Sequence, residues 1–334
     1  MSLVVTRTPY RISFFGGGTD YPAWYRDEGG QVLSTSINKY CFVTCRFFPE
    51  FFPPQHRIVW SSIEVVASIS DIRHPAVREA LVMMGFDDTR GIEVNHHGEL
   101  PARSGMGSSS AFAAGLIQAL STLKGKRLDA RALYENAIQL EQECLSENVG
   151  SQDQIAVSVG GLNHIRFGPG AAVEINPVSM SVERARDLRA HLMLFYLGRK
   201  RYASDIAGEV ISNISRRKSE LREIHGHVDT AIEILTGHGN LDQFGRLLDE
   251  TWQLKRRLGQ SVSNETVDDI YARACENGSW GGKLLGAGGT GFMLLCAPPD
   301  RQDAVRRAMA GHMLVDFDFD HKGCAVITNE DPEG

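Results

Sequence analysis

Residues 101–117 read PARSGMGSSSAFAAGLI, a turn rich in glycine and serine that runs directly into small and apolar helix formers. Gly105 and Gly107 allow the backbone to take positive φ values and to approach a ligand closely. A serine within 108–110 is expected to cap the helix that follows. A helix start with free N–H groups is a ready anion site, most often for phosphate, and the hydroxyls can help to hold a hard divalent cation. Taken alone, the stretch is equally compatible with an ordinary loop and helix cap.

The composition narrows the class of protein. A chain of 334 residues predicts two domains or one large α/β unit, and 42% hydrophobic with 23% charged residues is typical of a globular protein. The net charge of −6 argues against non-specific nucleic-acid binding. The six cysteines are scattered without a Cys-x-x-Cys pair, which indicates reduced thiols. No run is long enough for a membrane span and no signal peptide is visible, so we expect a cytoplasmic protein without nucleic-acid or membrane partners.

The order of the expected elements indicates an α+β fold. Strands are expected at 4–15, 57–60, 91–95, 162–167, 172–175, 191–197, 291–296, 313–319 and 323–327, with a hairpin or two strands within 31–48. Helices are expected from the serine turn to 124, at 129–146 with Asp129 as cap, at 204–258 with a break at 237–239, from Ser263 or Asn264 to 278, and at 300–310. The character of the chain changes between 170 and 195, so we place one domain at 1–180 and a second at 181–334.

Two further glycine-rich stretches accompany the opening one. In residues 7–21 a strand carries Arg11, and the turn Gly16-Gly17-Gly18 presents Asp20, which can accept hydrogen bonds from sugar hydroxyls or simply stabilise the turn. Residues 286–291 match Gly-x-Gly-x-x-Gly. A dinucleotide fingerprint would open a helix, whereas a strand is expected here, so we reject that interpretation. No Gly-Lys-Ser or Gly-Lys-Thr occurs, which excludes a Walker A loop.

Acidic residues of interest lie between 141 and 153. Glu141 is expected on a helix and Asp153 just beyond a turn. One carboxylate could hold Mg²⁺ while the other orients a hydroxyl nucleophile, since phosphoryl transfer needs mainly positioning and charge neutralisation. The alternatives are a solvated helix face for Glu141 and a helix cap for Asp153. The eleven histidines form no His-Glu-x-x-His pattern and no Gly-x-Ser-x-Gly elbow is present, so other metal and nucleophile chemistries are less favoured.

Taken in order, the three stretches resemble the motifs of the GHMP kinase family, named for galactokinase, homoserine kinase, mevalonate kinase and phosphomevalonate kinase. The first motif resembles residues 9–21, the second is a Pro-x-x-x-Gly-Leu-Gly-Ser-Ser loop seen at 101–109 with Met106 in place of leucine, and the third resembles 285–291. Within this family the chain resembles the bacterial heptose 7-phosphate kinases, which carry Gly-Gly-Gly-Thr-Asp where galactokinases carry Gly-Glu-His-Thr-Asp, and which also resemble it at 150–154.

The resemblance implies roles for individual residues. Asp153 would orient and deprotonate the sugar hydroxyl, and Arg11 would offset charge on the transferred phosphoryl group. Mg²⁺ would be held by Glu141 and by Ser108 or Ser109. The expected ATP-binding residues are Pro101, Arg103, Ser104, Gly105, Met106, Gly107, Ser108 and Ser109.

The sugar would be contacted by Gly17, Gly18, Thr19, Asp20, Gly288 and Gly289. The basic run Arg199, Lys200 and Arg201 is the candidate for a distal phosphate of the substrate, and a solvated basic run is the alternative.

The implied architecture is a first domain like the second domain of ribosomal protein S5 and a ferredoxin-like second domain, with ATP and sugar between them. The implied reaction uses ATP and Mg²⁺ to phosphorylate the anomeric hydroxyl of D-glycero-D-manno-heptose 7-phosphate, giving the 1,7-bisphosphate. Two alternatives stay open: a kinase of another sugar such as fucose, and a non-catalytic sensor of sugar or nucleotide. A homodimer is also left open.

Overall fold

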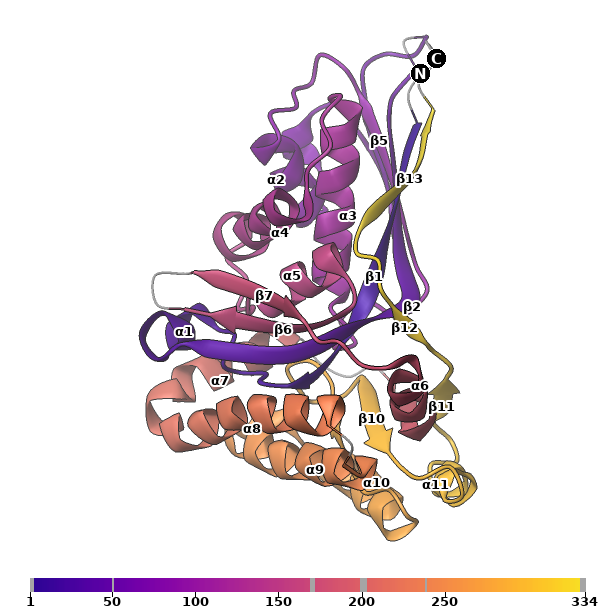
Figure 1. Cartoon of the computed structure of the whole chain (residues 1–334). Helices are drawn as coiled ribbons and strands as arrows, with labels where there is room; N and C mark the ends of the chain where they lie inside the picture. Colours follow the sequence, from indigo (N-terminus) through magenta and orange to yellow (C-terminus); the bar gives the residue numbers. More distant parts are fainter. Residues whose placement is uncertain (1–2, 50, 169–171, 199–202, 238, 331–334) are drawn as a thin grey trace.

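The computed structural model describes residues 3–49, 51–168, 172–198, 203–237 and 239–330. Two sheets organise this part of the chain, one of nine strands and one of four. In the larger sheet the strand order is β13-β1-β2-β5-β3-β4, with β12 and β6 also paired to β2, and β7 paired to β6. The smaller sheet has the order β11-β8-β10-β9. The fold is the expected α+β class with two domains (Figure 1).

Two long strands form the centre of the larger sheet. β1 (Leu3–Phe15) pairs antiparallel with β2 (Gly30–Phe47), and the register shifts between Pro9 and Tyr10. The prediction of a hairpin or two strands within 31–48 was therefore wrong. Asn38 and Lys39 lie opposite this register shift as a bulge, and β2 pairs with β1 on both sides of it.

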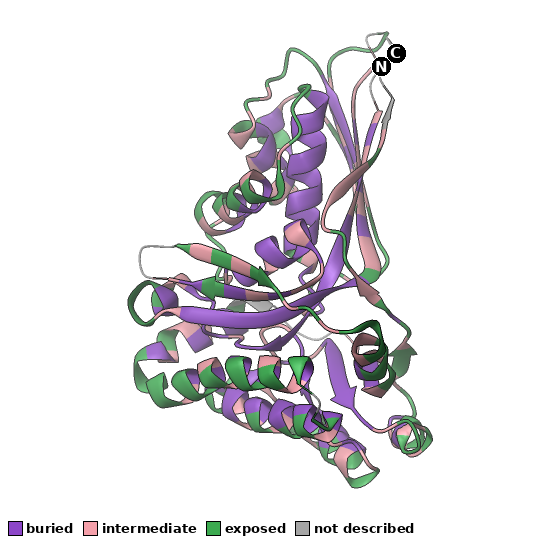
Figure 2. Cartoon of the chain, in the orientation of Figure 1, coloured by how far each residue is buried: buried purple, intermediate pink, exposed green. Residues whose placement is uncertain are grey.

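Helix α3 (Ser108–Leu123) is the buried core of the first domain (Figure 2). Its small residues let it approach the sheet closely: a Cβ on Gly115 would lie 2.9 Å from Thr8 Oγ1. Thr6 donates a hydrogen bond to the Gly115 carbonyl at 2.9 Å, which ties the helix to β1. This packing holds the start of α3 at a defined place beside β1.

The remaining elements of the first domain surround this pair. α2, α3, α4 and α5 lie on the same side of the sheet (Figure 1). Asp129 caps α4 as predicted, accepting the Ala132 N–H at 2.8 Å, but the expected helix 129–146 changes to a π-helical turn at 139. The elements are α1 (Pro22–Glu28), β3 (His56–Val59), β4 (Ile63–Val66), α2 (Pro75–Met83), β5 (Ile92–Gly98), α4 (Ala130–Ile138), the π-helix (Gln139–Cys144), α5 (Gln152–Val159), β6 (Leu162–Phe167) and β7 (Val173–Pro177).

The second domain is largely helical, as the sequence predicted for 204–258. Asn264 caps α10, accepting the Val267 N–H at 3.1 Å. The elements are α6 (Val182–His191), β8 (Leu192–Tyr196), α7 (Ala203–Asn213), α8 (Lys218–Thr236), α9 (Leu241–Arg257), α10 (Glu265–Glu276), β9 (Gly281–Leu284), β10 (Phe292–Cys296), α11 (Gln302–Ala308) and β11 (Met313–Val315).

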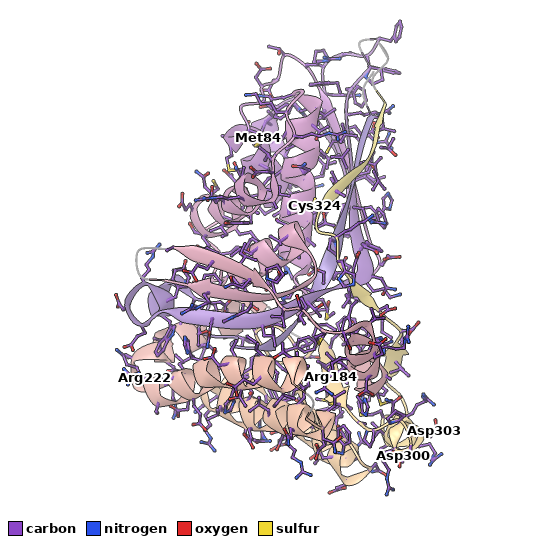
Figure 3. The ribbon with its side chains drawn as sticks, in the orientation of Figure 1. Met84, Arg184, Arg222, Asp300, Asp303 and Cys324 are labelled. Carbon is purple, nitrogen blue, oxygen red and sulfur yellow. The ribbon has the colours of Figure 1, made fainter. Side chains whose placement is uncertain are left out.

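The end of the chain returns to the first domain. β12 (Phe319–Asp320) pairs with β2, and β13 (Ala325–Glu330) pairs with β1, so Leu3 at the start of β1 lies opposite Glu330 at the end of β13 (Figure 1). Thr8 Oγ1 donates to Sγ of Cys324, labelled in Figure 3, at 3.1 Å. The division at 180/181 separates the two sheets except for this terminal segment.

Aromatic packing and ion pairs join the two domains. The Phe14 and Phe15 rings of β1 meet the Phe244 ring of α9 edge-on, with centroids 5.5 and 5.2 Å apart. Arg222 of α8, labelled in Figure 3, pairs with Glu28 at the end of α1 at 3.0 Å. These contacts hold β1 and α1 of the first domain against α9 and α8 of the second. No helix in the described ranges is long and apolar enough to cross a membrane, and all six cysteines are free thiols.

Candidate active site

An arginine–carboxylate pair lies in a cleft that is lined by residues of both domains. Arg11 Nε and Nη2 donate to the two oxygens of Asp153, each at 2.7 Å, and Arg11 Nη1 donates to the Gly105 carbonyl at 2.6 Å. Arg11 is 3% exposed, whereas the Asp153 side chain is 25% exposed and faces the cleft. Residues 142 positions apart in the sequence are thus joined by a bidentate bond, the strongest geometry for such a pair.

The serine-rich loop ends at an uncapped helix. Gly107, with φ of 72°, is the N-cap residue of α3, and no side chain of the described chain caps this helix start. The prediction that a serine caps it was wrong: the three serines are already helical, and Ser108 Oγ instead accepts the Arg103 N–H at 2.9 Å. The unpaired N–H groups of the first turn therefore remain available to an anion at the cleft.

The second and third glycine-rich stretches interlock. A Cβ on Gly105 would lie 2.4 Å from the Leu285 carbonyl oxygen, and a Cβ on Gly286 would lie 2.4 Å from Gly105 Cα. Farther along, a Cβ on Gly291 would lie 2.4 Å from the Ser104 carbonyl oxygen. The 286–291 glycines thus pack directly against residues 101–109, which are called the phosphate loop below. Strand β10 follows these glycines, which agrees with the rejection of a dinucleotide fingerprint.

Asp20 is held in the cleft by the first glycine-rich stretch. It is 4% exposed, and Oδ1 accepts the Gly18 N–H at 2.9 Å. Gly150 gives room for its other oxygen, since a Cβ there would lie 1.8 Å from Oδ2. Burial raises the pKa of Asp20, and the negative charge of Asp153 acts in the same direction. Gln152 also bonds this carboxyl, so Asp20 is a buried, hydrogen-bonded acid that lines the cleft beside Asp153.

Glu141 is buried behind the serines of α3. It lies in the π-helical turn, and Oε2 accepts bonds from Ser110 Oγ and Gln154 Nε2, both at 2.6 Å. Burial raises the pKa of this carboxyl to about 7, and the nearby Ser110, Ser109 and Gln154 side chains oppose the shift. Glu141 Oε1 has no partner within the described residues. An orphaned carboxylate oxygen beside serine hydroxyls fits Mg²⁺, which takes oxygen ligands.

That metal site is sparse in protein ligands. The described residues contain no group of three or more His, Cys, Asp or Glu side chains that could hold a metal. Mg²⁺ is commonly bound by one or two carboxylates together with water and substrate phosphates. The arrangement of Glu141 with Ser109 is therefore compatible with a cation that arrives with a nucleotide.

Several cleft residues were missed from the sequence. Ser13 Oγ and Gln152 Oε1 are buried and have no partner in the described part of the chain, and both residues line the cleft. An apolar wall of Ala207, Val210 and Leu258 lies in the same cleft. Polar groups combined with an apolar surface suit a sugar, which has hydroxyls at its edges and an apolar C–H face. Ser13 and Gln152 belong to the stretches 9–21 and 150–154, but only the fold shows that these residues line the cleft. Ala207, Val210 and Leu258 belong to no motif.

Two buried lysines were also missed. Lys283 is 2% exposed, and its Nζ donates to the carbonyls of Ser13 and Phe14, both at 2.9 Å. Lys255 is 8% exposed, and its Nζ donates to the Gly286 carbonyl. Burial lowers the pKa of both amines, that of Lys255 to about 8. Lysines are almost never fully buried unless paired, so nothing in a helix or strand pattern pointed to them.

Some predicted residues have supporting roles instead. Thr19, predicted as a sugar contact, is fully buried and bonds the backbone oxygens of Gly16 and Gln31, and it is not among the residues that line the cleft. Gly288 and Gly289 pack against the 261–262 backbone and Ile206 rather than lining the cleft.

Of the eight residues predicted to bind ATP, five line the cleft and three do not. Arg103, Gly105, Gly107, Ser108 and Ser109 line the cleft. Pro101, Ser104 and Met106 do not, because Ser104 bonds the Pro101 carbonyl and Met106 is buried in the core. The basic run Arg199, Lys200 and Arg201 lies outside the described residues.

An aromatic patch lies close to the phosphate loop. It consists of Trp60, His74 and Phe112: the Trp60 and His74 centroids are 4.9 Å apart, and those of His74 and Phe112 are 5.1 Å apart. Phe112 lies one turn beyond Ser108 on α3, and Trp60 is 40% exposed. Burial lowers the pKa of His74, and the charge of Arg103 acts in the same direction, which places the patch near this loop.

Comparison with known proteins agrees with this geometry. The chain is 25% identical over 346 residues to a D-glycero-alpha-D-manno-heptose 7-phosphate kinase of Campylobacter jejuni, covering 97% of this chain and 98% of that protein. It is 25% identical to a bifunctional fucokinase/GDP-fucose pyrophosphorylase of Arabidopsis thaliana, covering 92% of this chain and 31% of that longer protein. The crystal structure of a D-glycero-D-manno-heptose 1-phosphate kinase from Bacteroides thetaiotaomicron superposes with a TM-score of 0.79 at 20% identity, covering 97% and 99% of the two chains.

Two family models match the chain, one in its first half and one in its second half. The model of the GHMP kinases N terminal domain matches residues 73–161, which include the phosphate loop, Glu141 and Asp153. The model of the GHMP kinases C terminal domain matches residues 231–314, which include Lys255 and the 286–291 glycines. With these two matches and the superposition over nearly its whole length, the chain belongs to the GHMP kinase family.

Proposed function

We propose that this protein is an ATP-dependent sugar kinase and that its acceptor is D-glycero-D-manno-heptose 7-phosphate, phosphorylated at the anomeric hydroxyl. The observation that carries the proposal is the placement of the Arg11–Asp153 pair against the phosphate loop. A Cβ on Gly107 would lie 3.1 Å from Arg11 Cγ and 3.6 Å from Asp153 Oδ2. A carboxylate and a guanidinium therefore adjoin the helix start that would bind the phosphates of ATP.

The chemistry follows from these positions. The acceptor oxygen forms a bond to the γ-phosphorus of ATP while the bond from that phosphorus to the bridging oxygen of ADP breaks, and the hydroxyl proton passes to the Asp153 carboxylate. Arg11 keeps Asp153 oriented through two hydrogen bonds and offsets the charge of the phosphoryl group. Mg²⁺, held by Glu141 and Ser109, would neutralise phosphate charge when bound.

Three polar side chains support a polyhydroxylated acceptor. Asp20, Ser13 and Gln152 line the cleft beside Asp153, and Ser13 Oγ and Gln152 Oε1 have no partner among the described residues. A site built to bond hydroxyl groups rejects analogues that lack them, because its buried polar groups would then lose their partners. This chemistry favours a sugar over an acceptor with a single hydroxyl.

The aromatic patch is the proposed position of the adenine ring. From the start of α3 the phosphates would extend toward Trp60 and His74, whose rings offer flat apolar surfaces for a purine. The Arg199–Arg201 run stays our candidate for the distal phosphate of the sugar.

The relatives are named for different substrates, so the position of the substrate phosphate and the identity of the sugar both need an experiment. One relative is named for a heptose 7-phosphate and one structure for a heptose 1-phosphate, so the position of the substrate phosphate needs a direct test. The fucokinase relatives support a second candidate, a hexose without phosphate. The third candidate, a non-catalytic sensor, is disfavoured by the complete set of Arg11, Asp153 and Glu141.

The test is ADP release with ATP and Mg²⁺ across a panel: heptose 7-phosphate, heptose 1-phosphate, fucose and galactose. We expect turnover with heptose 7-phosphate above all others, and phosphorus NMR of the product should show a new anomeric phosphate. Turnover with fucose alone would establish the second candidate. ATP binding without ADP release from any sugar would establish the sensor.

A further inference from the structure

Lys255 is a buried cation in the cleft without a carboxylate partner. It lies near the C-terminal end of α9, and it lines the cleft together with Arg11, Asp20 and Asp153. It donates to the Gly286 carbonyl, and its next acceptor, the Leu284 carbonyl, is 3.5 Å away. No carboxylate of the described chain lies within 4.0 Å of it. An ammonium group has three donors, so at least one is left for a ligand.

Lys283 shows what a purely structural lysine looks like in this fold. Its Nζ makes two bonds of 2.9 Å to consecutive carbonyls of β1 and so links the two sheets. Lys255 has one close bond and one long contact. Lys255 is also not required to offset the negative end of the α9 helix dipole, because Arg256 and Arg257 lie in the same last turn and can do so.

Arg11 alone leaves the transferred phosphoryl group poorly neutralised. All three of its guanidinium nitrogens are already bonded, two of them to Asp153, which offsets its positive charge. Lys255 brings a positive charge that is not matched in this way, and the carbonyl it holds belongs to Gly286, which packs on Gly105 of the phosphate loop.

We propose that Lys255 is a further catalytic residue of this site, whose ammonium group binds the phosphoryl group as it passes from ATP to the acceptor. The proposal rests on the proposed function. It adds Lys255 at the phosphoryl oxygens, where preorganised charge lowers the barrier most, to the Arg11 guanidinium, whose charge is shared with Asp153.

The surroundings also predict a pH dependence. Burial and the positive charge of Arg11 lower the pKa of Lys255 to about 8, while Asp20 and Asp153 oppose this shift. Lys283 faces it from β9, and the two amines repel each other. The ammonium form, which binds phosphate, is therefore lost as the pH rises through about 8, and the rate should fall with it.

The experiment compares Lys255→Met, Lys255→Arg and a control, Arg257→Met, on the full-length protein. Arg257 lies two residues farther on the same helix and is exposed. We expect Lys255→Met to lower kcat about a hundredfold while KM for ATP changes by less than about threefold. Lys255→Arg should recover part of the rate and move the alkaline fall to higher pH, because arginine stays charged. Arg257→Met should behave as the wild type.

A second readout needs no sugar. Calorimetry would measure the binding of Mg²⁺–ADP with aluminium fluoride, which mimics the phosphoryl group in transfer, to the wild type and to each variant. We expect Lys255→Met to weaken this complex about a hundredfold and to leave Mg²⁺–ADP alone unaffected. If no sugar of the panel is turned over, the proposed function fails, yet this measurement still decides the role of Lys255. The proposal would be overturned if Lys255→Met bound Mg²⁺–ADP with aluminium fluoride as tightly as the wild type. It would also be overturned if the rate of Lys255→Arg fell at the same alkaline pH as that of the wild type.

Discussion

Gly286 rests directly on Gly105, and this contact joins the third glycine-rich stretch to the phosphate loop. A Cβ on Gly286 would lie 2.4 Å from Gly105 Cα, and Gly286 has a φ of +73°. Gly286→Ala should therefore push the two turns apart and raise the Kd for Mg²⁺–ATP at least about tenfold, since the space for a methyl group is absent. Isothermal titration would measure this change.

Gly125 provides a matched control for this substitution. It has the same φ of +73°, but a Cβ there would meet nothing within 4 Å. Gly125→Ala carries the backbone strain without the collision, so it should lower the melting temperature slightly and leave ATP affinity unchanged. Equal losses of ATP affinity in both variants would contradict the role of the interlock.

Gly150 should control sugar binding through Asp20. A methyl group at Gly150 would lie 1.8 Å from Asp20 Oδ2 and would displace that carboxylate. We expect Gly150→Ala to raise KM for the sugar at least about tenfold with KM for ATP unchanged, measured by steady-state kinetics. Gly226→Ala, at a helical position where a Cβ meets nothing within 4 Å, is the control. A loss confined to ATP binding would refute this assignment.

Asp153→Asn should abolish proton transfer while keeping the shape of the side chain. We expect kcat to fall by about 10²–10⁴-fold, the range for loss of a general base, with the Kd for ATP within about threefold of the wild type. Single-turnover kinetics and ATP titration separate the two effects. Full turnover of this variant with unchanged ATP binding would show that Asp153 is not the base.

Trp60→Ala should weaken ATP without affecting the chemistry. Trp60 offers an aromatic surface in the proposed adenine patch, so its loss should raise KM for ATP by about five- to tenfold with kcat little changed. Phe51→Ala is the control, because Phe51 is 91% exposed and makes no ring contact with the patch residues. An equal change in KM for ATP in the two variants would show that the adenine ring binds elsewhere.

Replacing Lys255 should make the fold more stable at neutral pH. Its folded pKa of about 8 lies below the ordinary 10.5, so burying the charged amine destabilises the protein by about 3 kcal/mol below pH 8. As the pH rises from 8 to 10.5, the unfolded chain binds more protons than the folded one, and this penalty disappears. Denaturant unfolding of Lys255→Met at pH 7 should show a gain of about 1–3 kcal/mol over the wild type, shrinking toward pH 10.5. A lysine kept only for stability would give a loss instead.

Local chemistry explains what could be predicted from the sequence. The glycine turns at 16–18, 105–107 and 286–291 and the caps at Asp129 and Asn264 depend on neighbouring residues, so they were visible in the chain. The long strand β2 was predicted as a hairpin or two strands, because its bulge is produced by pairing with β1, which no local pattern records.

The sequence by itself determined the α+β class, the family resemblance and the order of the three glycine-rich stretches, because each of these depends on short-range turn chemistry and spacing. Only the tertiary structure decided that Arg11 bonds Asp153, that Gly286 packs on Gly105, that Thr19 turns away from the cleft, and that Lys255 and Lys283 enter it. These relations join residues that lie far apart along the chain, and they arise where two sheets and their helices meet. The physical reason is that burial and electrostatic partners are properties of packed surfaces, which form only when distant segments come together.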